Sequence, residues 1–336
     1  MNGLTDLTVV VPTRGDGSTV LDGVGAVLSM GARLLILNNG DSSIMSPAIE
    51  SFGEQVTELL EPRMFAEQLR DSANSVETEY VVVVDDDQFL LPSATADAVR
   101  ILHSNESVQF AFGRILALER SAAGFRITAN PKELLWREPI RWRAPTQERL
   151  LDLARCWRSG TWYSVMRRQF FASEMELAYA VRTTCSTPSA TEVAAEVLGR
   201  TVVSRSLGPT ALQVRSLIRP SHVLPSHNSS LSYHQWRTSS NYADEVEQFD
   251  RMVEDYVVRD AKEIAMRALP LMADDGMQLM DLVSLQAQRG RLLAQRLGVA
   301  RRPGNLRVGP LVRRLLADQD TQELTRWVRR VVAAHG

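Results

Sequence analysis

The sequence predicts an α/β fold, with a doubly wound, mainly parallel sheet, a loop-rich second lobe and a helical C-terminal tail. Three observations lead to this prediction. Short apolar runs alternate with segments of helical periodicity over the first 120 residues, which is typical of a sheet with helices on both faces. Residues 121–240 hold five of the six tryptophans and many prolines. From residue 241 onward, apolar residues recur at spacings of three and four.

Five apolar runs rich in β-branched residues predict strands in the first part of the chain. They are Leu7–Val11, Arg33–Leu37, Val56–Leu60, Tyr80–Val84 and Val108–Leu118. We expect Pro12 to end the first run, since proline has no N–H to donate to a neighbouring strand.

Helical segments are predicted between these strands and again near the C-terminus. The first group is residues 18–30, with Ser18 or Thr19 as the cap, then Pro47–Phe52, Arg63–Val76 and Pro92–Ser104. The second group is Leu279–Leu297, Pro310–Leu316 and Thr321–Ala334, preceded by an apolar stripe from Val246 to Val257. We therefore divide the chain into residues 1–120, 121–240 and 241–336.

Composition narrows the class of protein. The chain has 336 residues, a net charge of −2 and 44% hydrophobic residues, which is ordinary for a globular protein and gives no sign of nucleic-acid binding. Cys156 and Cys185 are too far apart in the sequence for a CxxC redox pair or a two-cysteine zinc knuckle and are expected to be free thiols. Neither a signal peptide nor a run of roughly 18 to 20 apolar residues is found. We expect a cytoplasmic protein.

The basic charge is concentrated at the C-terminal end. From Ser284 onward there are eleven arginines against Asp318, Asp320 and Glu323, so this stretch carries +8 (11 − 3) and the remainder −10. A basic tail on an acidic body indicates a tail that meets something anionic or docks on its own body. Solvated helix faces are the ordinary interpretation. The other is contact with an acidic partner, a second copy of the chain or an anionic membrane surface, which would place the protein peripheral to the inner membrane.

Polar clusters follow three of the predicted strands. They are Pro12-Thr13-Arg14, Asn38-Asn39-Gly40-Asp41 and Asp85-Asp86-Asp87. Because the carboxyl ends of parallel strands meet at one edge of a sheet, where ligands bind, this rim is the candidate site.

The acidic triplet is the most informative motif. Three consecutive carboxylates repel one another, and a bound divalent cation offsets that repulsion. Hard oxygen donors suit Mg²⁺ or Mn²⁺, which also bind phosphate oxygens. Alternation along an extended chain would send Asp85 and Asp87 to one side and Asp86 to the other. We expect Asp85 and Asp87 to bind the metal and Asp85 and Asp86 to contact a nucleotide.

Two other families with carboxylates after a strand fit less well. Haloacid dehalogenase-type phosphatases carry their aspartates near the start of the chain, whereas several strands and helices precede the triplet here. Receiver domains have a different order of acidic residues and are shorter.

Three stretches resemble family 2 glycosyltransferases with the A-type nucleotide-sugar fold. Leu7–Arg14, ending in Val-Pro-Thr-Arg, resembles their first strand, Leu35–Ser42 their second, and Ala66–Pro92 the segment with the metal-binding aspartates. The resemblance covers about residues 5–120. It departs at the end of the second strand, where the family usually has an aspartate and this chain has Asn38-Asn39, followed by Asp41.

The resemblance implies a metal-dependent hexosyltransferase-type reaction with Mn²⁺ or Mg²⁺. An acceptor hydroxyl would attack the anomeric carbon with inversion, and a nucleoside diphosphate, UDP favoured, would leave. Residues 1–120 would bind the nucleotide sugar, residues 121–240 an unknown acceptor, and residues 241–336 would form a helical extension. The nucleotide-sugar-binding residues would be Pro12, Thr13, Arg14, Asn39, Asp41, Arg70, Asp85 and Asp86.

The resemblance also places a carboxylate base in the second lobe, at the start of a helix. Glu192 is the first candidate and Glu196 the second, although a glutamate at a helix N-terminus is also favoured by the helix dipole alone. His222 and His227 are candidates for a further metal ligand, as in several related enzymes. In the same predicted lobe, Trp157, Trp162 and Tyr163 fit either a sugar-stacking wall or core packing.

Two alternative functions stay open. A sugar-1-phosphate nucleotidyltransferase shares this type of sheet, but Arg14-Gly15-Asp16-Gly17 is only a faint version of its phosphate loop. A non-catalytic sugar-binding or scaffold protein of the same fold is the other, because the family's usual Glu-Asp pair is not intact here.

Overall fold

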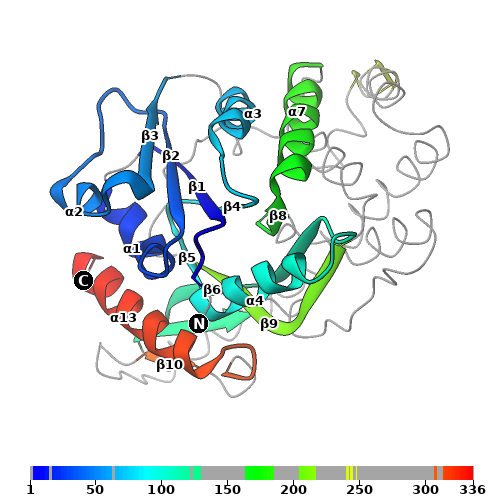
Figure 1. Cartoon of the computed structure of the whole chain (residues 1–336). Coiled ribbons are helices and arrows are strands. Elements are labelled where there is room, and N and C mark those ends of the chain that lie inside the picture. The colour runs from blue at the N-terminus through cyan, green and yellow to red at the C-terminus, as the bar shows by residue number, and fades with distance from the viewer. Residues whose placement is uncertain are drawn as a thin grey trace.

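The computed structural model of the chain describes residues 3–14, 17–62, 65–121, 124–129, 163–184, 204–216, 306–308 and 313–335, together with 240–241, 243–244 and 247. The structural statements below concern these residues. Figure 1 shows them as a central sheet with helices on both faces.

The sheet begins with four parallel strands in the order β3 (Val56–Leu60), β2 (Arg33–Asn38), β1 (Leu7–Thr13) and β4 (Tyr80–Val83). It continues through β8 (Val165–Arg167), β6 (Phe110–Ser121), β7 (Gly124–Ala129) and β10 (Leu306–Val308). β8 is antiparallel to both β4 and β6, and β6 is antiparallel to β7. β9 (Ser204–Ser216) pairs in parallel with β6 and in antiparallel with the short strand β5 (Gln88–Leu90).

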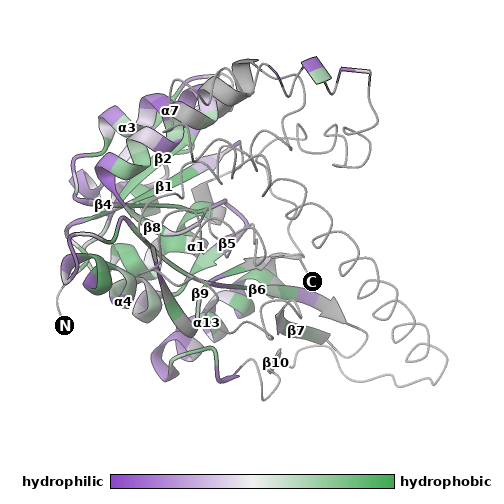
Figure 2. Cartoon of the chain, turned by 90° about the vertical axis from the view of Figure 1, so that its right-hand side faces the viewer, coloured by the Kyte–Doolittle hydropathy of each residue, from purple (hydrophilic) through white to green (hydrophobic). Residues whose placement is uncertain are grey.

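Side chains of the central strands alternate between two apolar cores, one on each face of the sheet. In β1, Val9 and Val11 lie in one core and Val10 in the other; in β4, Val82 and Val83 divide in the same way. A strand buried on both faces is a continuous apolar run rather than an alternating one. Figure 2 shows the central strands mostly in the hydrophobic colour. The predicted doubly wound α/β fold is therefore confirmed.

Helices α1 (Gly17–Leu28), α4 (Pro92–His103) and α13 (Asp318–His335) cover the first face. On the second face lie α3 (Phe65–Ser75) and α7 (Arg168–Thr184), which pack against each other. Between β2 and β3, a short helix α2 (Pro47–Glu50) is followed by a 3₁₀ turn, η1 (Gly53–Gln55). Ser46 precedes α2 and caps it, because its side chain accepts a hydrogen bond from the Ile49 N–H.

β1 runs two residues beyond its predicted end and includes Pro12. The carbonyl of Val10 accepts a hydrogen bond from the Val84 N–H, so Val10 faces the β4 side. Since backbone groups alternate between neighbours along a strand, Pro12 also faces that side, beyond the last paired residue of β4. The paired part of β4 thus ends where Pro12 offers no N–H.

The C-terminal helix α13 belongs to the same core as the first 120 residues. Leu324, Trp327, Val328 and Val331 are buried in the core on the α1–α4 face, and Figure 1 shows α13 beside α1. The predicted amphipathic helix over Thr321–Ala334 is confirmed, and its apolar side packs on the body of the protein. That side is therefore occupied within the chain itself. Apart from Glu247, the helical segments predicted between residues 246 and 297 lie outside the described residues.

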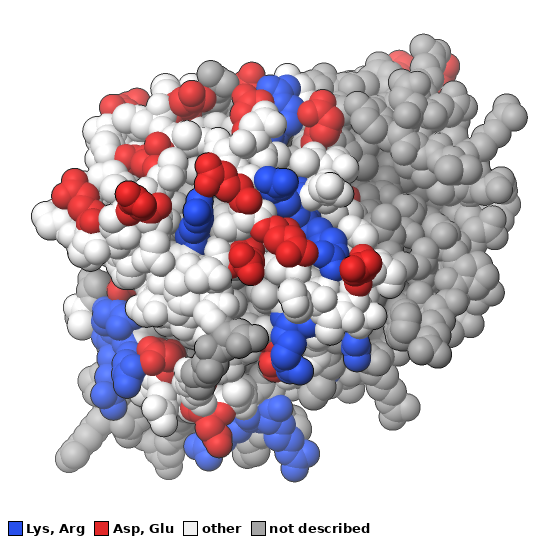
Figure 3. Space-filling view, in the orientation of Figure 1, with Lys and Arg blue, Asp and Glu red and all other residues white. Residues whose placement is uncertain are grey.

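Charged side chains of the described tail are partly neutralised by neighbours. Arg330 of α13 forms an ion pair with Asp22 of α1 at 2.8 Å, and Arg326 pairs with Glu323 one turn away at 2.5 Å. Acidic and basic side chains intermingle over the described part of the face in Figure 3. Among the helices that the structure describes, none has the length and apolar character to cross a membrane.

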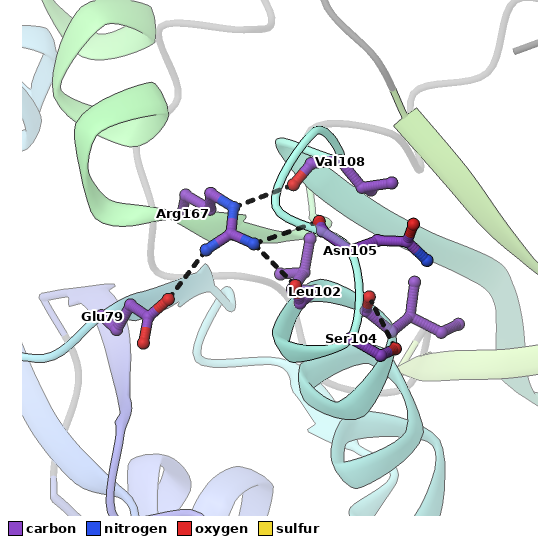
Figure 4. Close-up of polar contacts among 7 residues, drawn as sticks. Glu79, Leu102, Ser104, Asn105, Val108 and Arg167 are labelled. Carbon is purple, nitrogen blue, oxygen red and sulfur yellow. Dashed lines mark hydrogen bonds and ion pairs between the residues drawn. The ribbon is translucent and has the colours of Figure 1, made fainter. Parts of the chain in front are cut away.

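Arg167 joins the sheet to the end of α4 (Figure 4). Its guanidinium donates hydrogen bonds to the carbonyl oxygens of Leu102 (2.6 Å), Asn105 (3.1 Å) and Val108 (2.9 Å), and it pairs with Glu79 at 2.8 Å. The last carbonyls of a helix have no partner within the helix, so an arginine at this position satisfies them. Arg167 thereby fixes α4 and the following loop against β8.

Candidate active site at the acidic turn

The polar ends of β1 and β4 meet at one rim of the sheet, as predicted. The Thr13 hydroxyl at the end of β1 donates a 2.6 Å hydrogen bond to Oδ2 of Asp86, which follows β4. At the end of β2, the Asn39 N–H donates to the Thr13 carbonyl at 2.9 Å. Thr13 thus connects the acidic triplet to the loop after β2.

The triplet forms a turn rather than a continuation of the strand. β4 ends at Val83, and the Gln88 N–H donates to the Asp85 carbonyl at 3.0 Å, which closes a four-residue turn. The alternation expected for an extended chain therefore does not apply to these residues. All three aspartates are buried, with exposed fractions of 9% for Asp85, 3% for Asp86 and 4% for Asp87.

Asp85 is oriented by two side chains from different parts of the chain. Oδ2 of Asp85 accepts a 2.6 Å hydrogen bond from the Tyr163 hydroxyl and a 3.2 Å hydrogen bond from Nε2 of Gln88. Tyr163 lies just before β8, which runs antiparallel to β4, so the start of β8 meets the end of β4. Asp85 is thus bound from the β8 side and Asp86 from the β1 side.

β9 contacts both Tyr163 and the acidic turn. The amide of Gln213, a fully buried side chain of β9, donates to the Tyr163 carbonyl at 3.0 Å. At the end of the same strand, the Ser216 N–H donates to the Asp87 carbonyl at 2.8 Å. One strand therefore positions both Tyr163 and the backbone of the acidic turn.

The loop after β2 is held by Asn38 and Glu58. The Asn38 amide donates to the Ser42 carbonyl (2.8 Å) and to Oε1 of Glu58 (2.7 Å), while its own oxygen accepts from the Gly40 N–H (2.8 Å). Glu58 also accepts hydrogen bonds from the Ile44 N–H and the Ser43 hydroxyl. Burial opposes ionisation of Glu58, but these three donors outweigh it and lower its pKa. The Asn38 side chain thus fixes the conformation of this loop.

The donor set of the acidic turn fits a divalent cation such as Mg²⁺ or Mn²⁺. Carboxylate oxygens are hard ligands, and the three consecutive carboxylates are withdrawn from water. In the described part of the chain, no group of three or more His, Cys, Asp or Glu side chains is arranged to hold a metal ion. Mg²⁺ at phosphate-binding sites is commonly held by one or two carboxylates, with water and substrate phosphates as the remaining ligands. Two carboxylates of the acidic turn would be enough for a site of that kind.

The remaining predicted residues are distributed as follows. Arg14 and Asp41 are exposed beside the rim, and Asn39 is half-buried. On α3, Arg70 is bound by Asp71 at 2.7 Å and lies over the Tyr179 ring of α7, 4.0 Å from its centroid. The structure thus shows Arg70 joining α3 to α7. Glu192, Glu196, His222 and His227 lie outside the described residues, and their roles stay predictions.

Sequence reasoning missed Gln88 and Gln213 and gave Tyr163 another role. Gln88 directly follows the triplet, so its nearness could have been read from the chain. Tyr163 and Gln213 come from segments 78 and 128 residues beyond Asp85 (163 − 85 and 213 − 85), with no local motif to join them. Only the antiparallel placement of β8 and the crossing of β9 bring them to the rim.

Comparisons with known proteins give a weak likeness in structure. No protein-family model matches the sequence, and no curated protein matches it. A solved structure of residues 1–349 of S. aureus TarS is similar with a TM-score of 0.48 and 10% identity, covering 84% of this chain and 92% of that one. Another structure of S. aureus TarS has a TM-score of 0.43 and 10% identity, covering 82% of this chain and 55% of that one. At this level of similarity neither structure assigns an activity to this chain.

Proposed function

We propose that the protein is a metal-dependent glycosyltransferase that moves a sugar from a nucleoside-diphosphate sugar to an acceptor hydroxyl with inversion. The observation that carries the proposal is the buried acidic turn at the carboxyl end of β4, beside the ends of β1 and β2. An open parallel sheet binds its ligand at that edge. The motif resemblance over about residues 5–120 supports a nucleotide sugar as this ligand.

The chemistry requires stabilisation of a leaving diphosphate. Asp85 and Asp87 would hold Mn²⁺ or Mg²⁺, which when bound would offset the negative charge of the diphosphate oxygens. Asp86, fixed by Thr13 at 2.6 Å, would contact the nucleotide. The buried environment strengthens these electrostatic interactions because little water competes with them.

The nucleotide would lie along the loop after β2. Asn39 and Asp41 are placed at that loop, and the Arg14 guanidinium is exposed at the end of β1. An arginine there would pair with diphosphate oxygens. We favour UDP as the nucleotide on the basis of the resemblance alone. Arg70 is proposed to contact the nucleotide sugar from α3.

An acceptor hydroxyl becomes a better nucleophile when a carboxylate removes its proton. We propose Glu192 for this role, with Glu196 as the second candidate, and His222 or His227 as a further metal ligand. These residues come from the second lobe, which would also bind the acceptor.

The test is release of nucleoside diphosphate from a panel of nucleoside-diphosphate sugars in the presence of Mn²⁺. Because the acceptor is unknown, water serves as the acceptor in this assay. We expect turnover by the wild-type protein, its loss in excess chelator, and a drop of at least about 100-fold in Asp87→Asn. Asp97→Asn is the matched control, because Asp97 is a half-exposed aspartate of α4 that pairs with the surface residue Arg100. Full activity of Asp87→Asn would contradict the proposal. Pyrophosphate formed from a nucleoside triphosphate and a sugar 1-phosphate would instead identify a nucleotidyltransferase.

A further inference from the structure

We propose that Tyr163 is a positioning residue that, together with Gln88, sets the orientation of the Asp85 carboxylate for a divalent cation. The inference rests on the proposed function, because it assigns a role in the same site. It concerns a residue that touches a metal-binding carboxylate rather than the metal or the sugar.

Both hydrogen bonds to the Asp85 side chain that we describe end on one oxygen. Tyr163 donates at 2.6 Å and Gln88 at 3.2 Å, both to Oδ2. Neither donor therefore competes with a ligand for Oδ1. Two donors that converge on one carboxylate oxygen also restrict rotation of the carboxylate about its last side-chain bond. Restriction of this kind places a ligand atom before the cation arrives, which is how supporting residues raise the affinity of metal sites.

Tyr163 is itself fixed from two directions. Its carbonyl accepts the hydrogen bond from the buried Gln213 amide at 3.0 Å. Two residues later, Val165 pairs with Val82 of β4 and Ala111 of β6, so the chain enters the middle of the sheet at once. The hydroxyl is thus presented from a rigid part of the fold, although the residue lies outside the region of motif resemblance.

The type of donor matters for a cation site. Tyr163, Gln88 and Thr13 are all neutral, so they orient the carboxylates of the turn without adding positive charge. A lysine or arginine in the place of Tyr163 would fix Asp85 equally well but would repel the cation. A phenol hydrogen-bonded to a carboxylate at 2.6 Å has the short distance typical of a charge-assisted hydrogen bond, which is among the stronger ones.

The experiment is calorimetric titration of UDP into the full-length protein at a series of Mn²⁺ concentrations. From the Mn²⁺ dependence, an apparent Kd for Mn²⁺ is obtained for the wild type, Tyr163→Phe, Gln88→Met and the double variant. We expect Tyr163→Phe to weaken Mn²⁺ binding by about tenfold, the loss of one hydrogen bond to a charged group. We expect a smaller effect for Gln88→Met, because the hydrogen bond from Gln88 is longer than that from Tyr163. The double variant should bind Mn²⁺ more weakly than either single variant.

Tyr80→Phe is the matched control. It removes a buried hydroxyl from Tyr80, the first residue of β4, at the end of that strand farther from the acidic turn. Its apparent Kd for Mn²⁺ should equal that of the wild type. If neither UDP nor any other nucleoside diphosphate of the donor panel bound the wild type in an Mn²⁺-dependent way, the proposed function itself would be wrong. If the wild type bound with Mn²⁺ and Tyr163→Phe bound equally well, only the role of Tyr163 would be wrong. If Tyr163→Phe does not fold, the Gln88→Met variant provides the test. An apparent Kd for Mn²⁺ equal to that of the wild type in Gln88→Met would then overturn the inference.

Discussion

The ring of Trp327 in α13 stacks on the ring of Phe89 in β5, with centroids 5.3 Å apart and an angle of 26° between the planes. Phe89 is the second residue after Asp87, so a side chain from the C-terminal helix supports the strand that leaves the acidic turn. Both aromatic rings are buried, with exposed fractions of 1% each. The C-terminal helix α13 is therefore a structural part of the half of the protein that carries the candidate site.

We predict that Trp327→Ala lowers the free energy of unfolding by about 3–5 kcal/mol, the usual loss when a large aromatic side chain is removed from a core. Urea unfolding followed by far-UV circular dichroism measures this change. Arg329→Ala, an exposed position on the same helix, is the control and should change stability by less than about 0.5 kcal/mol. Equal stability of the two variants would show that α13 does not support the core.

Asp320 predicts a specific pH dependence of stability. Its carboxylate is buried and accepts a 2.8 Å hydrogen bond from the Ser93 N–H at the start of α4. Burial raises the pKa of Asp320 above its ordinary value of 3.8, although the N–H donors of α4 oppose this shift. The folded protein therefore holds the Asp320 proton more tightly than the unfolded chain, and stability from this group is lost as pH rises through the raised pKa.

The measurement compares wild type with Asp320→Asn, which cannot titrate. We expect the unfolding free energy of the wild type, relative to the variant, to fall as the pH is raised from about 4 and then to level off. A difference that stayed constant, or that grew with pH, would contradict the assignment.

Arg167→Met should destabilise the protein by about 2–4 kcal/mol, because it removes a charged side-chain donor from the carbonyls of Leu102, Asn105 and Val108. Thermal unfolding provides the measurement. Arg100→Met is the control, since the Arg100 side chain is 75% exposed and forms only a surface pair with Asp97 among the contacts described. Comparable losses in both variants would mean that the contacts in Figure 4 do not fasten α4.

Gly23 and Gly25 of α1 form a matched pair. A Cβ at Gly23 would lie 2.2 Å from the carbonyl oxygen of Gln88, whereas a Cβ at Gly25 would meet nothing within 4 Å. We expect Gly23→Ala to destabilise by about 1–3 kcal/mol through overpacking and to weaken Mn²⁺ binding by moving Gln88. Gly25→Ala should be neutral or stabilising by up to about 1 kcal/mol, because alanine favours a helix. Tolerance of Gly23→Ala with unchanged Mn²⁺ binding would refute the close contact between α1 and β5.

Asn38 donates a hydrogen bond to Glu58, which favours an amide over a carboxylate at this position. Asn38→Asp would remove the amide donor to Glu58 and set two carboxylates side by side. We expect a lower unfolding temperature for Asn38→Asp, and partial recovery in Asn38→Asp/Glu58→Gln. Thermal unfolding at neutral pH and at pH 4 should show a smaller loss at the lower pH, where the repulsion is reduced. A full loss in the double variant would show that repulsion from Glu58 is not the cause.

The parallel half of the fold could be predicted because its signals are local. The strand Val56–Leu60 has the predicted bounds, and β2 and β4 differ by one residue from the predicted ends. Each central strand is a continuous apolar run, and each helix between them has its own periodicity. The end of α13 was also predicted from periodicity, but its docking partner was not, because Phe89 lies more than 200 residues earlier.

The antiparallel half of the fold was harder to predict from the sequence. β5 and β8 have only three residues each, too few for a periodic signal, and their places depend on pairing with β9, β4 and β6. For the site, the triplet and Thr13 were found from the chain, whereas Tyr163 and Gln213 were not identified as its partners. Such contacts depend on strand order, which no local pattern encodes.

The central claim is that the acidic turn after β4 holds a divalent cation that binds a nucleoside diphosphate. A crystal structure of the full-length protein grown with UDP and Mn²⁺ tests it most directly. The account predicts a metal ion bound to the Asp87 carboxylate, with the diphosphate beside it and the nucleoside over the loop after β2. A nucleotide bound elsewhere, or an acidic turn left without metal when UDP is bound, would contradict it.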